Sequence, residues 1–252
     1  MRFVSWLVVA GCWLGAGCRG TPPGEGPDEI GLSALVDSLV PQVEKAVGLT
    51  FAKPPRSALR SKDQVRAYLL AKLDGEFPTA KIEGVENAYR LLELIPDTLD
   101  IKSLLLPLYA EQVAGYYDPD STMLYAVEGA DPSQLRLVLA HELVHALQHE
   151  QLPLDQLLKD VTNSDRLAAT QAVLEGHATV AMLNVILAEQ AGGSAALLDN
   201  PAFWQQYRDQ VKSAQTSMPV FTAAPLVLRE GLIFPYLAGA EFVRWWDGQP
   251  GR

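Results

Sequence analysis

The sequence predicts a predominantly helical α+β protein, and three observations support this fold class. Apolar residues recur at intervals of three and four through most of the chain after residue 30, which is the spacing of amphipathic helices. Two short runs rich in tyrosine and branched residues, 113–117 and 123–127, flank a turn sequence at 118–121, as in a β-hairpin. A helix with clear start and stop residues is predicted after the hairpin, and a second long helix is predicted after that one. We therefore expect a hairpin placed before two helices.

The composition is that of a globular protein. With 252 residues, the chain is long enough for one large or two small domains. Its 30 acidic residues outnumber the 20 basic ones, which gives a formal net charge of −10. Proteins that neutralise nucleic-acid phosphates need a basic surface, so the composition excludes nucleic acid as a partner. We expect an N-terminal helical region over 31–112 and a core over 113–252, or one continuous domain over 31–252.

The N-terminus has the pattern of an export signal. Arg2 precedes an apolar run over residues 3–10, and small residues follow, as in a secretory signal that is too short to span a bilayer as a mature helix. Cys12 and Cys18 each follow small residues and resemble the lipidated cysteine of the bacterial lipobox. Cys18 gives the more usual signal length, and Cys12 the better local match. An ordinary cleaved signal with incidental cysteines is the alternative.

These features predict where the protein works. We expect a lipoprotein-type signal peptide over 1–17, lipidation at Cys18 (alternatively Cys12) and a flexible tether over 18–30, which is rich in glycine and proline. The protein is then exported and held by its lipid in the membrane of the bacterial cell envelope, on the periplasmic side or in the outer membrane. No cysteine follows Cys18, so the folded part has no disulfide.

Four helices are expected before the hairpin. Apolar spacing predicts the first over about 30–47, with Pro41 bending or dividing it. A capping box at 61–64 starts a second helix, which runs to about residue 73. A third is expected over about 82–94, and Asp100 can cap a fourth. This region has no cluster of metal-binding residue types, so we expect it to contribute packing and the shape of a cleft.

The helix after the hairpin carries the sequence HELVH at 141–145. Residues four apart lie on the same face of a helix, so His141 and His145 can bind one metal ion, and Glu142 can reach a water bound to that metal. Asp131 and the proline after it predict the helix start, and Pro153 predicts its end. The alternative is a solvated helix whose histidines lie on its surface by chance.

The second long helix begins near residue 163 and supplies a third candidate ligand. Glu175 lies among apolar residues, where a carboxylate is costly to bury without a partner, and a metal held by two histidines is such a partner. Gly176 would let two helices approach closely. A solvated acid is the alternative reading of Glu175. His177 points to a different side of the helix, and Asp165 could orient a ligating imidazole, although an acid at a helix N-terminus needs no such role.

The motif at 141–145 with a downstream Glu175 resembles the gluzincin clan of zinc metallopeptidases. The segments GYYDP at 115–119 and LEGHA at 174–178 are more similar to a group of largely uncharacterised bacterial proteins of this type, often secreted or lipid-anchored. Over roughly residues 110–245, the resemblance implies a zincin-like core. It also implies one Zn²⁺ per chain bound by His141, His145 and Glu175, with Glu142 as general base. Relatives commonly have an acidic residue where this chain has His177.

Together these inferences predict zinc-dependent peptide-bond hydrolysis by an envelope-anchored endopeptidase, with a metal-bound water activated by Glu142. His177, Tyr236 or one of the hairpin tyrosines could stabilise the oxyanion. The edge of the hairpin could hold an extended peptide or protein substrate as an added strand. The alternative is a non-catalytic envelope lipoprotein that uses a zincin-like fold as a binding or assembly module.

Overall fold

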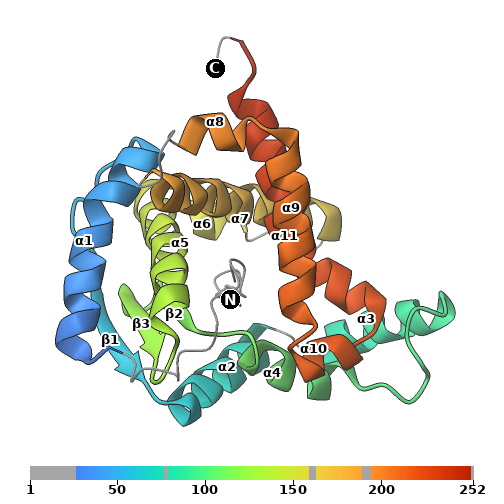
Figure 1. Ribbon diagram of the computed structural model, residues 1–252. Helices are drawn as coiled ribbons and strands as arrows, with labels where there is room; N and C mark the ends of the chain where they lie inside the picture. The colour runs from blue at the N-terminus through green and yellow to red at the C-terminus, as the bar shows by residue number, and fades with distance from the viewer. Residues whose placement is uncertain (1–26, 77–78, 159–162, 189–193, 251–252) are drawn as a thin grey trace.

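The structure is a computed structural model that describes residues 27–76, 79–158, 163–188 and 194–250. Within these ranges the chain forms helices and one small sheet (Figure 1), so the predicted predominantly helical α+β class is confirmed. The predicted signal peptide, Cys12, Cys18 and most of the predicted tether lie outside the described residues.

The sheet has three strands among the described residues, in the order β1-β3-β2. The predicted hairpin is confirmed as β2 (Gly115–Asp118) and β3 (Met123–Val127), which pair antiparallel with Tyr116 opposite Tyr125. A third strand, β1 (Arg56–Arg60), was not predicted. It pairs parallel with β3, with Arg56 opposite Met123. Parallel pairing joins segments that are far apart in the sequence, and the local pattern of β1 contains no sign of its partner.

The helices are named in chain order and have the following bounds: α1 (Glu29–Val47), α2 (Lys62–Glu76), α3 (Thr79–Leu91), α4 (Ile101–Ala110), α5 (Pro132–Gln151), α6 (Leu154–Leu157), α7 (Ser164–Leu187), α8 (Ser194–Leu198), α9 (Pro201–Gln215), α10 (Pro219–Ala223) and α11 (Leu226–Asp247). The helix α5 carries the HELVH motif, and α7 carries Glu175. Both long helices were predicted after the hairpin, and both are confirmed.

Most of the predicted helix boundaries hold. Pro41 lies inside α1 and does not divide it. The capping box of α2 forms as expected, because Gln64 N–H donates to Ser61 Oγ at 3.3 Å and Ser61 N–H donates to Gln64 Oε1 at 2.9 Å. Asp100 caps α4 through Ser103 N–H. The third helix is shifted towards the N-terminus of its predicted range, since α3 ends at Leu91.

The motif helix α5 lies at the centre of the fold. Helices α1 and α7, the hairpin strand β2 and strand β3 all pack against it, and Figure 1 shows α1 on one side of α5 and α9 with α11 on the other. One large cluster of buried apolar side chains therefore includes residues from α1, α5, α7 and α9. Because α5 is covered on several sides, polar side chains on it are enclosed in the protein rather than exposed to solvent.

The helices α7 and α11 cross at unusually short range. A Cβ placed on Gly176 would lie 2.1 Å from the carbonyl carbon of Gly239, and one placed on Gly239 would lie 2.0 Å from the carbonyl oxygen of Ala172. Only two glycines can make this contact, so the close approach predicted at Gly176 is confirmed. None of the described helices has the length and hydropathy that a bilayer span requires.

Candidate metal centre

The helix α5 places the motif side chains in the interior. Asp131 accepts a hydrogen bond from Ser133 N–H at 2.8 Å and caps the helix, as the sequence predicts. His141, Glu142 and His145 are at most 3 % exposed. The alternative of histidines on a solvated surface is therefore wrong. Three polar side chains in a row of buried positions are expensive unless each has a partner.

The helix α7 supplies that partner. Glu175 is 6 % exposed, so it is not a solvated acid on an outer face. Its Oε2 lies 3.1 Å from Nε2 of His141 and 3.1 Å from Nε2 of His145, and the two Nε2 atoms are 3.0 Å apart. Two histidines of α5 and a glutamate at least thirty positions later thus direct three donor atoms to one point, within the described part of the chain.

This triangle has the dimensions of a metal site. Donor atoms that bind one zinc ion at about 2.0–2.2 Å lie roughly 3–3.5 Å from one another. The three observed separations match that spacing, and the set of two imidazole nitrogens and one carboxylate oxygen is a known zinc donor set. His141, His145 and Glu175 therefore form a group that could hold one metal ion.

The charges within the triangle are coupled. Burial opposes ionisation of Glu175, but the neighbouring His145 and His141 outweigh it and lower the pKa of this carboxyl to about 2. Burial disfavours the charged imidazolium and so lowers the pKa of His141. Burial would lower the pKa of His145 too, but the carboxylate of Glu175 has the larger effect and raises this pKa above its usual range. Glu175 is thus an anion that attracts positive charge to the two imidazoles, from a proton or from a metal ion.

Glu142 lies beside the triangle and is held by one of its two oxygens. Oε2 accepts a hydrogen bond of 2.8 Å from the backbone N–H of Tyr117 in β2. Oε1 is buried and has no hydrogen-bond partner among the described residues. Burial raises the pKa of Glu142 to about 8, against the smaller opposing effects of His145 and of the Tyr117 N–H. A buried carboxyl with one free oxygen and a pKa near neutrality can take up and release a proton.

A buried glutamine that the sequence analysis missed organises the histidines. Gln148 Nε2 lies 2.9 Å from the carbonyl oxygen of Leu174, which can only accept, so this atom is the amide nitrogen. Its Oε1 then faces Nδ1 of His145 at 2.8 Å and accepts the Nδ1–H. This bond leaves Nε2 of His145 unprotonated in the neutral ring and directed at the triangle.

The same amide fixes a third ring. Nε2 of Gln148 lies 3.0 Å from Nδ1 of His177, which must accept from it, so a neutral His177 carries its proton on Nε2. Burial and the neighbouring His145 lower the pKa of His177, which favours this neutral form. The signal for Gln148 was available in the sequence, because it is a polar residue three positions after His145 in an apolar stripe.

The remaining candidate residues fall into two groups. The ring of Tyr236, on α11, is buried and packs against His141 with ring centroids 5.9 Å apart. Asp165 is exposed in the first turn of α7 and is not one of the three clustered ligands. The other histidine of the motif helix, His149, contacts the hydroxyl of Tyr117 through Nδ1 at 2.9 Å. The structure thus brings Tyr236 and His177 to the centre and leaves Asp165 at the surface.

The two other hairpin tyrosines are packing residues. Tyr116 stacks on Tyr68 of α2 with ring centroids 4.4 Å apart, and it lies 5.2 Å from the ring of Tyr125. Burial raises the pKa of the Tyr116 hydroxyl above its usual range. These rings fill the space between the sheet and α2, whereas Tyr117 faces α5.

Comparison with known proteins does not assign this centre. No protein-family model, no curated protein and no solved structure matches the chain. The resemblance to gluzincins therefore depends on the motif residues and on the geometry that brings His141, His145 and Glu175 together.

Proposed function

We propose that this protein is a zinc-dependent peptidase of the gluzincin type that hydrolyses internal peptide bonds. One observation carries the proposal: three buried donor atoms converge within 3.1 Å, with the free Oε1 of Glu142 beside them. A structural zinc site needs a closed set of four ligands, whereas a catalytic one keeps a position open. Three ligands plus a neighbouring carboxylate are the catalytic pattern.

The chain's own residues prepare the site for zinc. The Nδ1–H of His145 donates a hydrogen bond to Gln148 Oε1, so Nε2 of the neutral ring carries no proton and can bind a metal ion. Glu175 contributes a negative charge. When bound, zinc lowers the pKa of a coordinated water and polarises a peptide carbonyl. His141, His145 and Glu175 would hold the ion.

Glu142 has the geometry of the general base. The Tyr117 N–H holds Oε2, which leaves Oε1 to take the proton of the attacking water. The carboxyl then passes that proton to the amide nitrogen as the peptide bond breaks. A cation next to Glu142 favours its charged form and so offsets the effect of burial on its pKa.

Two side chains are suited to stabilise the negative oxygen that develops on the carbonyl. His177 can donate from Nε2–H, because its Nδ1 accepts from Gln148. Tyr236 can donate from its hydroxyl, and its ring already packs on His141. Asp165 has no part in this proposal, since it is exposed in the first turn of α7.

The substrate is a peptide or protein. Strand β2 pairs with β3 on one side, and on the other side its Tyr117 N–H is bound to Glu142 of α5. All four residues of β2 are buried, so the hairpin edge at which the sequence analysis expected an added substrate strand is already covered. The export signal and the cysteines at 12 and 18 support an enzyme that is lipid-anchored in the cell envelope, through Cys18 or Cys12.

The test compares the full-length protein with its Glu142→Gln variant. We expect about one zinc per chain in both proteins by elemental mass spectrometry, because Glu142 is not a ligand. Cleavage of a defined peptide mixture should fall at least about 100-fold in the variant, since a general base contributes roughly that much or more. Glu128→Gln, which changes an exposed glutamate, is the matched control and should cleave like the parent.

Two results would contradict the proposal. A Glu142→Gln variant that cleaves as fast as the parent would exclude the assigned base. A protein that takes up no zinc, and whose folding is unaltered by a chelator, would favour a non-catalytic envelope lipoprotein instead.

A further inference from the structure

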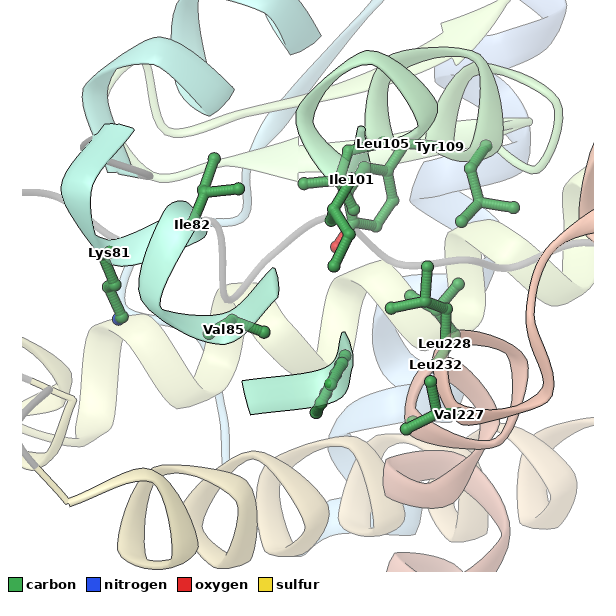
Figure 2. Close-up of a pocket in the computed structure, with 12 residues that line it drawn as sticks. Lys81, Ile82, Val85, Ile101, Leu105, Tyr109, Val227, Leu228 and Leu232 are labelled. Carbon is green, nitrogen blue, oxygen red and sulfur yellow. The ribbon is translucent and has the colours of Figure 1, made fainter. Parts of the chain in front are cut away.

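Two cavities in the described part of the chain lie outside the metal centre. One, of about 220 Å³, opens between α3, α4 and α11 and is lined mainly by apolar side chains (Figure 2). The other, of about 310 Å³, lies beside the C-terminal half of α5, between Tyr117, His149 and the segment 51–56. Neither is lined by a candidate ligand or by Glu142. The second cavity nevertheless includes Tyr117, whose N–H holds the carboxylate of Glu142.

Tyr117 is bonded to α5 at two points. Its backbone N–H donates to Oε2 of Glu142 at 2.8 Å, and its hydroxyl oxygen lies 2.9 Å from Nδ1 of His149. Glu142 and His149 are seven residues apart, which corresponds to two turns and about 10.5 Å along one face of the helix. One residue of β2 therefore spans the motif helix from the proposed base to the last turn.

The turn of α5 between these two points accommodates the tyrosine ring. Ala146 lies on the same face, four residues after Glu142 and three before His149. Ala146 and Tyr117 belong to the same apolar cluster and line the same cavity. The Tyr117 ring is buried, and its centroid lies 5.8 Å from that of His149. Packing thus holds the ring along its length, and a hydrogen bond holds its end.

The hydroxyl of Tyr117 lies two helical turns from Glu142, which places it away from the reacting atoms. Burial raises the pKa of Tyr117 to about 12, so the hydroxyl keeps its proton at neutral pH. It can donate to Nδ1 of His149 when that nitrogen is unprotonated and accept from it when it carries a proton. The bond therefore forms in every protonation state of His149, and the pair is a fixed connection.

A strand as short as β2 needs a second connection to α5. It has four residues, and its pairing with β3 does not set its position along the helix. The bond from the Tyr117 N–H to Glu142 fixes one point and leaves the strand free to tilt about it. A second bond about two turns along the same helix removes this motion.

We infer that His149 is a positioning residue for the general base, because through the Tyr117 hydroxyl it fixes β2 along α5. The Tyr117 N–H then meets Oε2 of Glu142, and Oε1 is left for the attacking water. The inference rests on the proposed peptidase function and deepens it. His149 contacts neither the metal nor the substrate in this role, and it acts only through Tyr117.

Two single variants remove the connection from either side. Tyr117→Phe removes the hydroxyl and keeps the ring and the N–H, and His149→Leu removes the partner. Each should lower kcat of the zinc-loaded full-length protein about 10-fold, since a displaced base is costly even at small distances. KM for a defined peptide and zinc content should stay within about twofold of the parent's values, because neither side chain is assigned to the substrate or the metal. The double variant should be no slower than either single variant, since the two side chains act as one unit.

A conservative variant and a matched control separate position from stability. His149→Asn places an amide close to the position of Nδ1, and it should restore kcat to within about threefold of the parent. Tyr68→Phe is the control, because the Tyr68 hydroxyl also bonds to β2, at Asp118 with 3.3 Å, but comes from α2. Its loss should lower the unfolding midpoint and leave kcat unchanged.

Hydrogen exchange at the amide of residue 117 measures the strand position without a substrate. NMR of the zinc-loaded protein should show slow exchange in the parent, because this N–H is bonded to a buried carboxylate. Exchange should become at least about 10-fold faster in Tyr117→Phe and in His149→Leu. The amide of Leu143, which is buried in the middle of α5, should exchange as in the parent, so general unfolding cannot explain the difference.

The possible outcomes separate this inference from the proposed function. A Tyr117→Phe or His149→Leu variant with the kcat of the parent overturns the inference alone, as do losses that multiply in the double variant. A change in KM with kcat unaltered would make the pair part of substrate binding and also overturns it. A protein that cleaves no peptide but exchanges faster at residue 117 in both variants overturns the proposed function and supports the connection between β2 and α5.

Discussion

At the scale of single residues, the amide of Gln148 sets the state of two histidines. Its nitrogen must face the carbonyl of Leu174, which can only accept a hydrogen bond. It follows that Nδ1 of His145 carries a proton and that Nδ1 of His177 accepts a hydrogen bond. Gln148 also joins α5 to α7 by these bonds. A side chain that touches no metal thereby determines which nitrogen of His145 is offered to one.

Gln148→Leu should weaken zinc binding about 10- to 100-fold, because His145 loses the partner that fixes its ring and its proton. Gln148→Glu should weaken it less, since a carboxylate still accepts the His145 Nδ1–H but cannot donate to Leu174. Competition with a chromophoric chelator measures both affinities.

The matched control for this series is Gln151→Leu. Gln151 is exposed on the same helix, and its side chain donates a hydrogen bond to Glu150. Its zinc affinity should equal the parent's. Equal affinities of Gln148→Leu and the parent would show that the amide does not position His145.

At the scale of elements, the crossing of α7 and α11 holds together two helices that border the metal centre. The two glycines at the crossing bring the helix axes close together, and this proximity places Tyr236 of α11 against His141 of α5. The helix that carries Glu175 and the helix that carries Tyr236 are thus fixed to each other by backbone contact.

Gly176→Ala should destabilise the protein by about 1–3 kcal/mol or more, because the added methyl would overlap the backbone of Gly239 and the helices must separate. Urea unfolding of the metal-free protein measures this loss. Gly84→Ala adds the same methyl in open space on α3 and should be neutral or stabilising by up to about 1 kcal/mol. Similar unfolding midpoints for the two variants would contradict the assigned contact.

The elements that sequence patterns predicted are those whose signals are local. The cap at Asp131, the capping box at Ser61 and the turn of the hairpin each lie within a few residues of the structure they specify. Strand β1 was missed because its pairing partner, β3, lies more than sixty residues away. Its sequence RSALR has no alternation that would distinguish a strand from a loop.

At the scale of the whole molecule, the candidate site was predictable where helix geometry alone decides it. The spacing of His141 and His145 on one helix already implies convergence, and Glu175 followed from the cost of burying an acid. The orientation of Gln148 could not be predicted, because it depends on a carbonyl of α7 that tertiary packing brings to α5.

The buried Glu142 should make the stability of the metal-free protein depend on pH. Its pKa is about 8 in the folded protein and near 4.5 ordinarily, so between these values the folded state holds a proton that the unfolded state has lost. Stability therefore falls as pH rises, by about 1.4 kcal/mol per pH unit and roughly 3–4 kcal/mol from pH 5 to pH 8. Glutamine at this position removes the titration.

Chemical unfolding in the presence of a chelator tests this dependence. The parent should lose stability between pH 5 and pH 8 relative to Glu142→Gln, and the two proteins should be closest near pH 5. Glu175 has the opposite effect, because its lowered pKa stabilises the folded protein above acidic pH. This effect is present in the parent and in the variant, so it cancels when their stabilities are compared. A constant difference between the two proteins across this range would contradict the burial-raised pKa of Glu142.

The bond from Tyr117 to Glu142 has a genetic consequence. Its donor is a main-chain N–H, so every amino acid except proline supplies it at position 117. In a saturation library, every replacement except proline that still folds would keep the main-chain donor, while the contact of the tyrosine hydroxyl with His149 would be lost. Because Tyr117 is buried in the main apolar cluster, packing restricts its side chain, and the main-chain bond that holds the base leaves no trace in that side chain.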